Sequence, residues 1–165
     1  MRKEALLAIA LVSCGAISFT LEQNLGENTI QGSLLGGLLP GFALTNPKLN
    51  FDIKQETEKR NTGPASAVVM ESFVLYITPQ SAPSGNFDFL TALDVFVSAP
   101  GLSETKIASL PKLDKGATKI TMTLVSGVNM LPYVNAGATI RAAAQGTQPS
   151  QTTTFSGDVV VRVRI

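Results

Sequence analysis

Alternation of apolar and polar residues is the main pattern along this chain. Apolar residues recur at every second position in several segments, which is typical of strands that bury one face. These segments lie at residues 17–21, 49–53, 67–77, 93–97, 120–124, 138–144 and 155–165. The stretches between them are rich in Gly, Pro, Asn and Asp, which favour turns. The pattern therefore predicts a mainly β protein.

The expected architecture follows from the one-sided burial of these strands. Strands with one wet and one dry face pack as two antiparallel sheets around a shared core. We expect an antiparallel two-sheet β-sandwich of immunoglobulin-like type, formed by one domain over residues 14–165. A small closed β-barrel satisfies the same alternation and is the alternative. With 44% apolar residues, a chain of 165 residues is long enough for one such core.

Composition limits the chemistry that the chain can perform. It has no histidine and a single cysteine, which excludes Ser-His-Asp and Cys-His catalysis, imidazole ligation of metals and disulfides within one chain. Thirteen basic and twelve acidic residues give a formal charge of +1, too little to attract nucleic acid strongly. We expect a protein that is not an enzyme, needs no cofactor and binds no nucleic acid.

The N-terminal segment has the features of an export signal. Positive charge in the first three residues precedes an uninterrupted apolar run over 5–12. A membrane-spanning helix needs about 20 apolar residues, so this run is too short to cross a bilayer. The sequence Leu11-Val12-Ser13-Cys14 resembles the lipobox of bacterial lipoprotein precursors. The alternative is that Cys14 is an ordinary small apolar residue near the end of a signal.

The lipobox resemblance implies a specific covalent anchor. Residues 1–13 would be removed as a signal peptide, and acyl chains on Cys14 would hold residues 14–165 at a membrane. Gly15 stands where lipoproteins retained at the inner membrane of enteric bacteria carry aspartate, which favours the outer membrane. Cleavage would remove two basic residues and one acidic residue, leaving eleven of each. We expect a non-catalytic binding or structural component of the cell envelope, with an envelope protein as partner.

A leucine-rich segment is the first candidate contact surface. Its apolar residues recur at helical spacing after Ser33, a candidate N-cap, although several glycines and Pro40 oppose a long helix. The candidate partner or lipid contacts are Leu34, Leu35, Leu38, Leu39 and Phe42. The alternative interpretation is a short helix or loop that closes one end of the sandwich, with its leucines buried, because leucine side chains are usually inside.

Charged residues provide two further candidates. Arg162 and Arg164 alternate with apolar residues, so both should lie on one face of the last strand, where they could bind phosphate or carboxylate. Alternatively, they keep the outer face of the strand soluble. The mixed charged run 54–60 is interpreted as a solvated strand end or hairpin.

Three acids close to predicted buried positions, Glu71, Asp88 and Asp94, leave room for a carboxylate-based hydrolase. That chemistry requires two carboxylates facing one cleft. Glu71 interrupts an apolar face, which points to a strand irregularity, a lysine partner or a pocket. A second alternative function is a carrier or chaperone for a hydrophobic ligand or lipid, with an apolar cavity bordered by residues 34–42.

Overall fold

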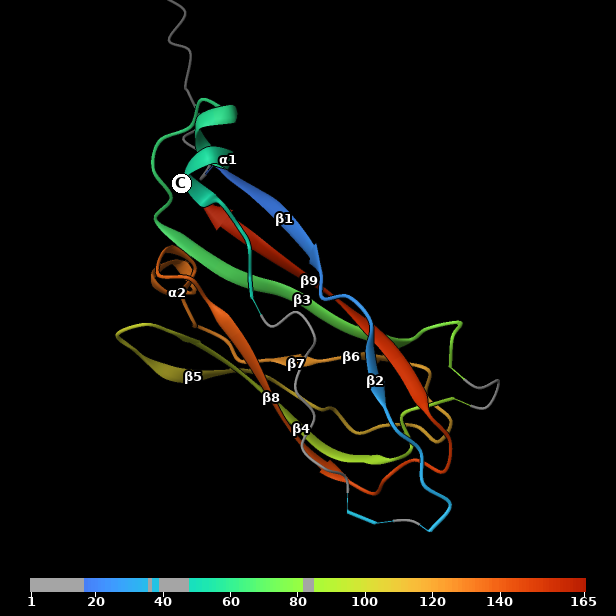
Figure 1. Cartoon of the computed structure of the whole chain (residues 1–165). Helices are drawn as coiled ribbons and strands as arrows, with labels where there is room; N and C mark the ends of the chain where they lie inside the picture. Colours follow the sequence, from blue (N-terminus) through green and yellow to red (C-terminus); the bar gives the residue numbers. More distant parts are fainter. Residues whose placement is uncertain (1–16, 36, 39–47, 82–84) are drawn as a thin grey trace, which may run out of the picture.

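Two antiparallel sheets face each other in the computed structural model, which describes residues 17–35, 37–38, 48–81 and 85–165 (Figure 1). The first sheet contains β1 (Ser18–Asn24), β2 (Asn28–Ile30), β3 (Ala67–Ile77), β6 (Lys119–Thr121) and β9 (Thr153–Arg164). The second contains β4 (Leu90–Ala99), β5 (Leu102–Ser109), β7 (Thr123–Leu124) and β8 (Thr139–Gly146). The predicted two-sheet β-sandwich is confirmed, and the closed-barrel alternative is wrong because the sheets do not join into a barrel.

The last strand forms the centre of the first sheet. β9 pairs with β1 from Ser18↔Arg164 to Asn24↔Asp158, and on its other side with β3. In the second sheet the order is β7-β5-β4-β8. The valines of β9 at positions 159, 161 and 163 are fully buried, as the alternation predicted. A strand with neighbours on both sides and one face on the core explains this burial.

The chain passes from one sheet to the other at Met122. β6 pairs with β3, while β7, only two positions further on, pairs with β5. Met122 itself is 3% exposed, and its backbone N–H donates to the Phe73 carbonyl at 2.9 Å. The predicted strand over 120–124 is therefore divided between both layers.

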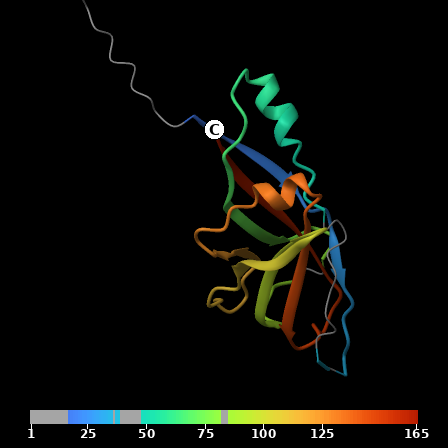
Figure 2. The same ribbon diagram turned by 90° about the vertical axis from the view of Figure 1, so that its left-hand side faces the viewer.

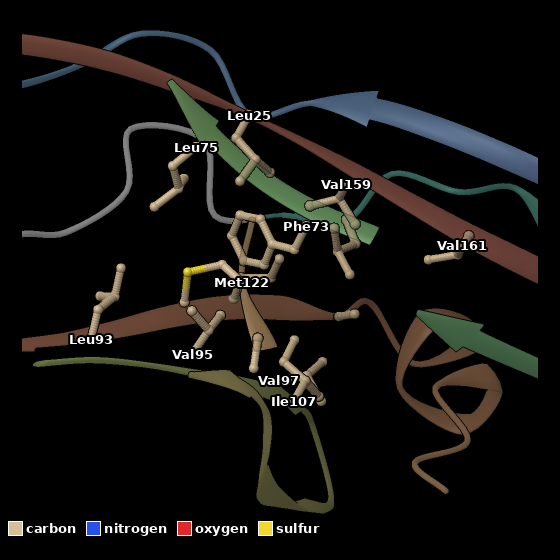
Figure 3. Packing of buried hydrophobic residues seen from close by; sticks show 14 of the residues in the cluster. Leu25, Phe73, Leu75, Leu93, Val95, Val97, Ile107, Met122, Val159 and Val161 are labelled. Carbon is tan, nitrogen blue, oxygen red and sulfur yellow. The ribbon is translucent and has the colours of Figure 1, made fainter. Parts of the chain in front are cut away.

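The core consists of apolar side chains from the inner faces of the two sheets (Figure 3). Phe73 and Val159 extend from the first sheet towards Met122 and Val95. At one end of the sandwich, Phe87 packs edge-on against Phe155, with ring centroids 6.0 Å apart. Edge-to-face pairs of this kind stabilise a core beyond the area they bury.

Glu71 occupies a β-bulge in β3. Met70 pairs with Val161 and Ser72 with Val160, so Glu71 is an extra residue without a partner in the ladder. The bulge changes which positions face the core: the even-numbered Val68 is buried before it, and the odd-numbered Phe73 after it. Unbroken alternation over 67–77 would place Val69 on the inner face together with Phe73; this expectation is wrong, because the extra residue reverses the alternation. Glu71 does lie at a strand irregularity, as considered from the sequence.

The predicted strand over 49–53 and the strand-end interpretation of 54–60 are wrong, because this region contains helix α1 (Ile53–Lys59). The Asp52 carboxylate caps the helix by accepting from the Gln55 backbone N–H at 2.9 Å. Glu56 pairs with Arg60 one turn later. Capping and pairs at helical spacing favour a helix over the apolar alternation. A second short helix, α2 (Leu131–Asn135), precedes β8 and contacts β3 and β4.

The sandwich has two distinct ends. At the proximal end, the Ile165 N–H donates to the Ile17 carbonyl, so the first described residue and the C-terminus lie together beside α1 (Figure 2). At the distal end lie β2, residues 31–35 and 37–38, and the β8–β9 connection over 147–152 (Figure 1). β1 and β2 carry the chain from the first end to the second.

Candidate interaction surface

Three leucines project from the distal end. Leu34, Leu35 and Leu38 are 92%, 98% and 89% exposed, and we call them the leucine tip. The predicted burial of these side chains in a plug is wrong, and so is the helix, since Leu34 and Leu35 lie in a turn and Leu38 in an isolated bridge. Leu39 and Phe42 lie outside the described residues.

Hydrogen bonds attach the leucine tip to the β8–β9 connection. The Ser33 N–H donates to the Pro149 carbonyl at 2.8 Å, and the Gln148 N–H donates to the Gly37 carbonyl at 2.9 Å. The Gln148 side chain also donates to the Gln31 carbonyl at 3.0 Å. The backbone on both sides of the two turn leucines is thus paired with the sandwich, while their side chains are not packed on it.

A close approach of the two chains fixes the base of the tip. A Cβ atom added at Gly32 would lie 2.3 Å from the backbone carbon of Gln151. Only glycine fits here without movement of one backbone, because such a contact is far inside the van der Waals distance. The sequence around the tip is therefore suited to hold residues 31–35 against the β8–β9 connection.

The distal end carries no formal charge over long stretches of sequence. Residues 28–47, 77–87 and 142–157 contain no Asp, Glu, Lys or Arg. The described parts of these segments adjoin one another, for example where Thr78 bonds Thr154 through its side chain at 2.9 Å. The segments that carry and adjoin the leucine tip are consequently polar but uncharged, with many Gln, Ser and Thr residues.

A hollow of about 380 Å³ lies beside the base of the tip. Its lining includes Asn86, Phe89, Gln148 and Gln151, together with the acid Asp88. The Asp88 carboxylate accepts a hydrogen bond from the Gly116 N–H at 2.6 Å, which ties it to the turn at residues 115–116. The hollow is open and mostly polar, unlike the apolar cavity expected for a lipid carrier.

A smaller apolar cavity of about 250 Å³ opens at the sheet edge between β3 and β7. Its apolar lining residues are Val69, Met70, Ile107, Leu124, Val125, Val128 and Met130. The described members of the segment 34–42 are absent from this lining, which places the cavity away from the leucine tip. The structure thus separates the two features that the carrier hypothesis combined.

The two arginines of β9 lie on its outer face, as predicted, but their surroundings differ. Arg162 forms an ion pair with Glu71 and approaches the Ser18 hydroxyl at 3.5 Å. Arg164 is exposed at the proximal end of the strand. Since the Arg162 guanidinium is held by the bulge residue, the partner of Glu71 is an arginine rather than the lysine considered from the sequence.

The candidate acids of a hydrolase lie on different elements and have separate partners. Asp94 on β4 pairs with Lys106 at 2.6 Å, Glu71 on β3 pairs with Arg162, and Asp88 precedes β4. Within the described ranges, no group of three or more acids or cysteines could hold a metal ion, and every buried side-chain nitrogen or oxygen atom has a hydrogen-bond partner. The structure therefore does not bring these acids together in one site.

Two surface ion pairs shift the titration of their members. Arg141 donates to both Glu104 carboxylate oxygens, at 2.9 and 2.6 Å, and also stacks over the Phe96 ring. These bonds lower the pKa of Glu104 and raise the pKa of Arg141. On α1, hydrogen bonds from Arg60 and then Lys59 lower the pKa of Glu56. Both carboxylates lie outside the distal end.

The described helices and the comparisons with known proteins complete the description of the chain. In the part of the chain that the structure describes, neither helix has the length and apolar character needed to cross a bilayer. Cys14 lies outside that part. Comparisons with models of protein families and with curated proteins found no match.

Proposed function

We propose that the chain is a bacterial outer-membrane lipoprotein, anchored through Cys14, that acts by binding rather than by catalysis. The observation that carries this proposal is the leucine tip, which exposes three leucines between long uncharged segments at one end of the sandwich. The largest exposed apolar patch on a soluble domain is often a surface that binds a partner or a membrane. The lipobox resemblance at Leu11-Val12-Ser13-Cys14 supplies the anchor and the envelope location.

The geometry gives the anchor and the tip separate roles. Ile17 is only three positions after Cys14, so the attachment point is within about 10 Å of the proximal end. The 12-residue β9 is about 40 Å long at the usual strand rise. A molecule standing on its acyl chains would therefore present the tip roughly 40 Å from the membrane that holds it.

The anchor is tested by mass spectrometry of the native protein and by cell fractionation. We expect an N-terminal peptide that begins at acylated Cys14, and we expect Cys14→Ser to release the protein from the membrane fraction. Ser13→Ala is the matched control, because it keeps a small residue before the cysteine and should leave attachment unchanged. An unmodified thiol, or a chain that still begins at Met1, would overturn the proposed location.

The binding role is tested in intact cells. A photo-crosslinking residue at Leu35 should capture an envelope component, whereas the same residue at Leu102 should not. Leu102 is 38% exposed on β5, away from the distal end, and so controls for apolar character alone. Equal capture from both positions would contradict a dedicated surface at the tip.

A carrier for a small hydrophobic ligand is the second candidate, favoured by the 250 Å³ apolar cavity at the sheet edge. Solvent extraction of purified protein, followed by mass spectrometry, would detect a bound lipid. Val128→Phe should fill the cavity and remove that lipid, while Leu35→Ser should not. Extracts free of lipid would favour the binding component over the carrier.

A further inference from the structure

We infer that the leucine tip inserts into the interface of a lipid bilayer. This inference rests on the proposed function for treating the tip as the binding surface, and it specifies the partner as lipid. Side chains of Leu34, Leu35 and Leu38 would enter the boundary between headgroups and acyl chains, while the sandwich stays outside. The contact is separate from the acyl anchor on Cys14, since it lies at the other end of the molecule.

The size of the exposed patch favours a bilayer over a protein. Three leucine side chains offer roughly 200–350 Å² of apolar area, from their transfer free energies. A stable protein interface takes about 800 Å² from each partner. A second copy of this chain meeting tip to tip would bury too little for a stable dimer. A bilayer needs no matching surface, because any apolar group that reaches its acyl region is removed from water.

The scarcity of charge around the tip lowers the main cost of insertion; the acid in the hollow beside its base, Asp88, already accepts a hydrogen bond from the Gly116 N–H. A charged side chain is expensive in the bilayer interior, and a charge beside the leucines would resist their entry. Residues 28–47 and 142–157 contain none, and Glu27, Lys48, Arg141 and Asp158 limit these stretches. The neighbouring Gln, Ser and Thr side chains can instead donate to headgroup phosphate and ester oxygens. Binding is therefore expected to be insensitive to salt and to need no anionic lipid.

Backbone hydrogen bonds on both sides of the turn reduce the number of polar groups that would meet lipid unpaired. Unpaired backbone groups cost several kcal/mol in hydrocarbon, so inserted loops need internal partners. The Ser33 N–H, the Gly37 carbonyl and the Gln148 N–H are bonded within the distal end, and Leu38 forms a bridge with Thr147. The leucines are thus presented on a base already ordered in the free protein, which lowers the entropic cost of binding.

The absence of tryptophan from the chain allows a direct test. Leu35→Trp places a unique fluorophore on the tip, and Leu102→Trp places one on β5 as the matched control. The probe is vesicles of zwitterionic phosphatidylcholine, with and without bromine on the acyl chains. The protein begins at residue 14 and carries no acyl group. That chain retains every described element and the whole core, which runs from Leu25 to Val163.

We expect the tryptophan at position 35 to shift its emission to the blue and to be quenched by brominated lipid, with no change from 50 to 500 mM salt. The tryptophan at position 102 should stay unquenched. In unlabelled protein, Leu34→Ser combined with Leu35→Ser should reduce vesicle partitioning at least about a hundredfold, and Leu102→Ser should leave it unchanged. Thermal unfolding of each variant checks that the fold is kept.

Three outcomes would overturn the inference. These are an unquenched tryptophan at position 35, binding that requires anionic lipid and disappears in salt, and self-association that the double serine variant abolishes. None of them concerns Cys14, so the proposed anchor is judged separately by its own mass spectrum. Capture of an envelope protein at Leu35, together with no insertion into vesicles, would retain the proposed function and exclude the lipid.

Discussion

The two ends of the sandwich expose different kinds of side chain to solvent. At the proximal end, α1 surrounds itself with ion pairs, such as Lys59 with Glu56 at 2.9 Å, and Arg60 lies over the Phe19 ring at 4.2 Å. At the distal end, long uncharged segments surround Leu34 and Leu35, which contact little of their own protein. The charged side chains of α1 have partners within the protein. The leucines of the distal end keep their apolar surface exposed and available for binding.

The contrast also separates residue type from residue role. Leu25 is fully buried, and its N–H donates to the Gly157 carbonyl at 2.8 Å, while Leu35, ten positions later, is 98% exposed. Leucine is thus a core residue at position 25 and a surface residue at position 35. Stability and binding should consequently respond to different leucines.

The largest expected effect compares these two leucines. Leu25→Ala should lower the free energy of unfolding by about 2–5 kcal/mol, because it leaves a cavity in a closed core. Leu35→Ala should change it by no more than about 0.5 kcal/mol, as is usual for exposed sites. Chemical denaturation of the chain from residue 14 measures both. Similar losses for the two variants would mean that Leu35 is packed in solution and that the ends do not differ.

The next effect concerns the backbone that supports the distal end. A Cβ at Gly146 would meet the Phe89 carbonyl oxygen at 1.9 Å, so Gly146→Ala should cost about 3 kcal/mol or more. Gly101→Ala is the control, because it also has positive φ but open space around it, and should cost about 1–2 kcal/mol. Unfolding midpoints in denaturant distinguish the two. Equal costs would indicate that β8 and the segment before β4 can separate easily.

A smaller effect is expected at the proximal end. Asp52→Ala removes the N-cap of α1 and should cost about 1 kcal/mol. Lys54→Ala on the same helix should be nearly neutral, because its pair with Glu58 is exposed and 4.0 Å long. Amide exchange should accelerate at Gln55 in the first variant and stay unchanged at residues 31–35. Faster exchange at both ends would contradict their independence.

The smallest effect is that of pH. The folded pKa of Glu56 and of Glu104 is below the ordinary 4.5, so each contributes stability above that pH and loses it as the pH falls through the lowered value. With no histidine, stability should stay nearly constant from about pH 5.5 to 8.5. Below pH 4, amide exchange should rise first in α1. A transition near pH 6.5 would disprove this account.

Alternation predicted most of the long strands, including β3, whose pairing is interrupted at Glu71. In β4, the buried residues Leu93, Val95 and Val97 follow the expected period of two. The alternation did not predict β5. Its pairing with β4 shifts register between Val95 and Phe96, so two consecutive residues of β5, Ile107 and Ala108, are both buried. A bulge is produced by pairing with another strand, so local alternation gives no sign of it.

Local signals also competed within the sequence. Residues 49–53 alternate like a strand, yet Asp52 followed by Gln55 is a helix-start signature that could have identified α1. For the candidate surface, the spacing of Leu34, Leu35 and Leu38 marked the segment but could not tell whether it was buried. The general preference of leucine for the interior favoured the wrong answer.

By itself, the sequence determined the β class, most long strands, the absence of histidine chemistry and the charge-free stretches near the leucines. These properties depend on residue type and on neighbours within a few positions. Only the tertiary structure decided the central place of β9, the pairing of Glu71 with Arg162 and the exposure of the leucine tip. Each of these depends on residues brought together from distant parts of the chain, and burial is decided by what packs against a side chain.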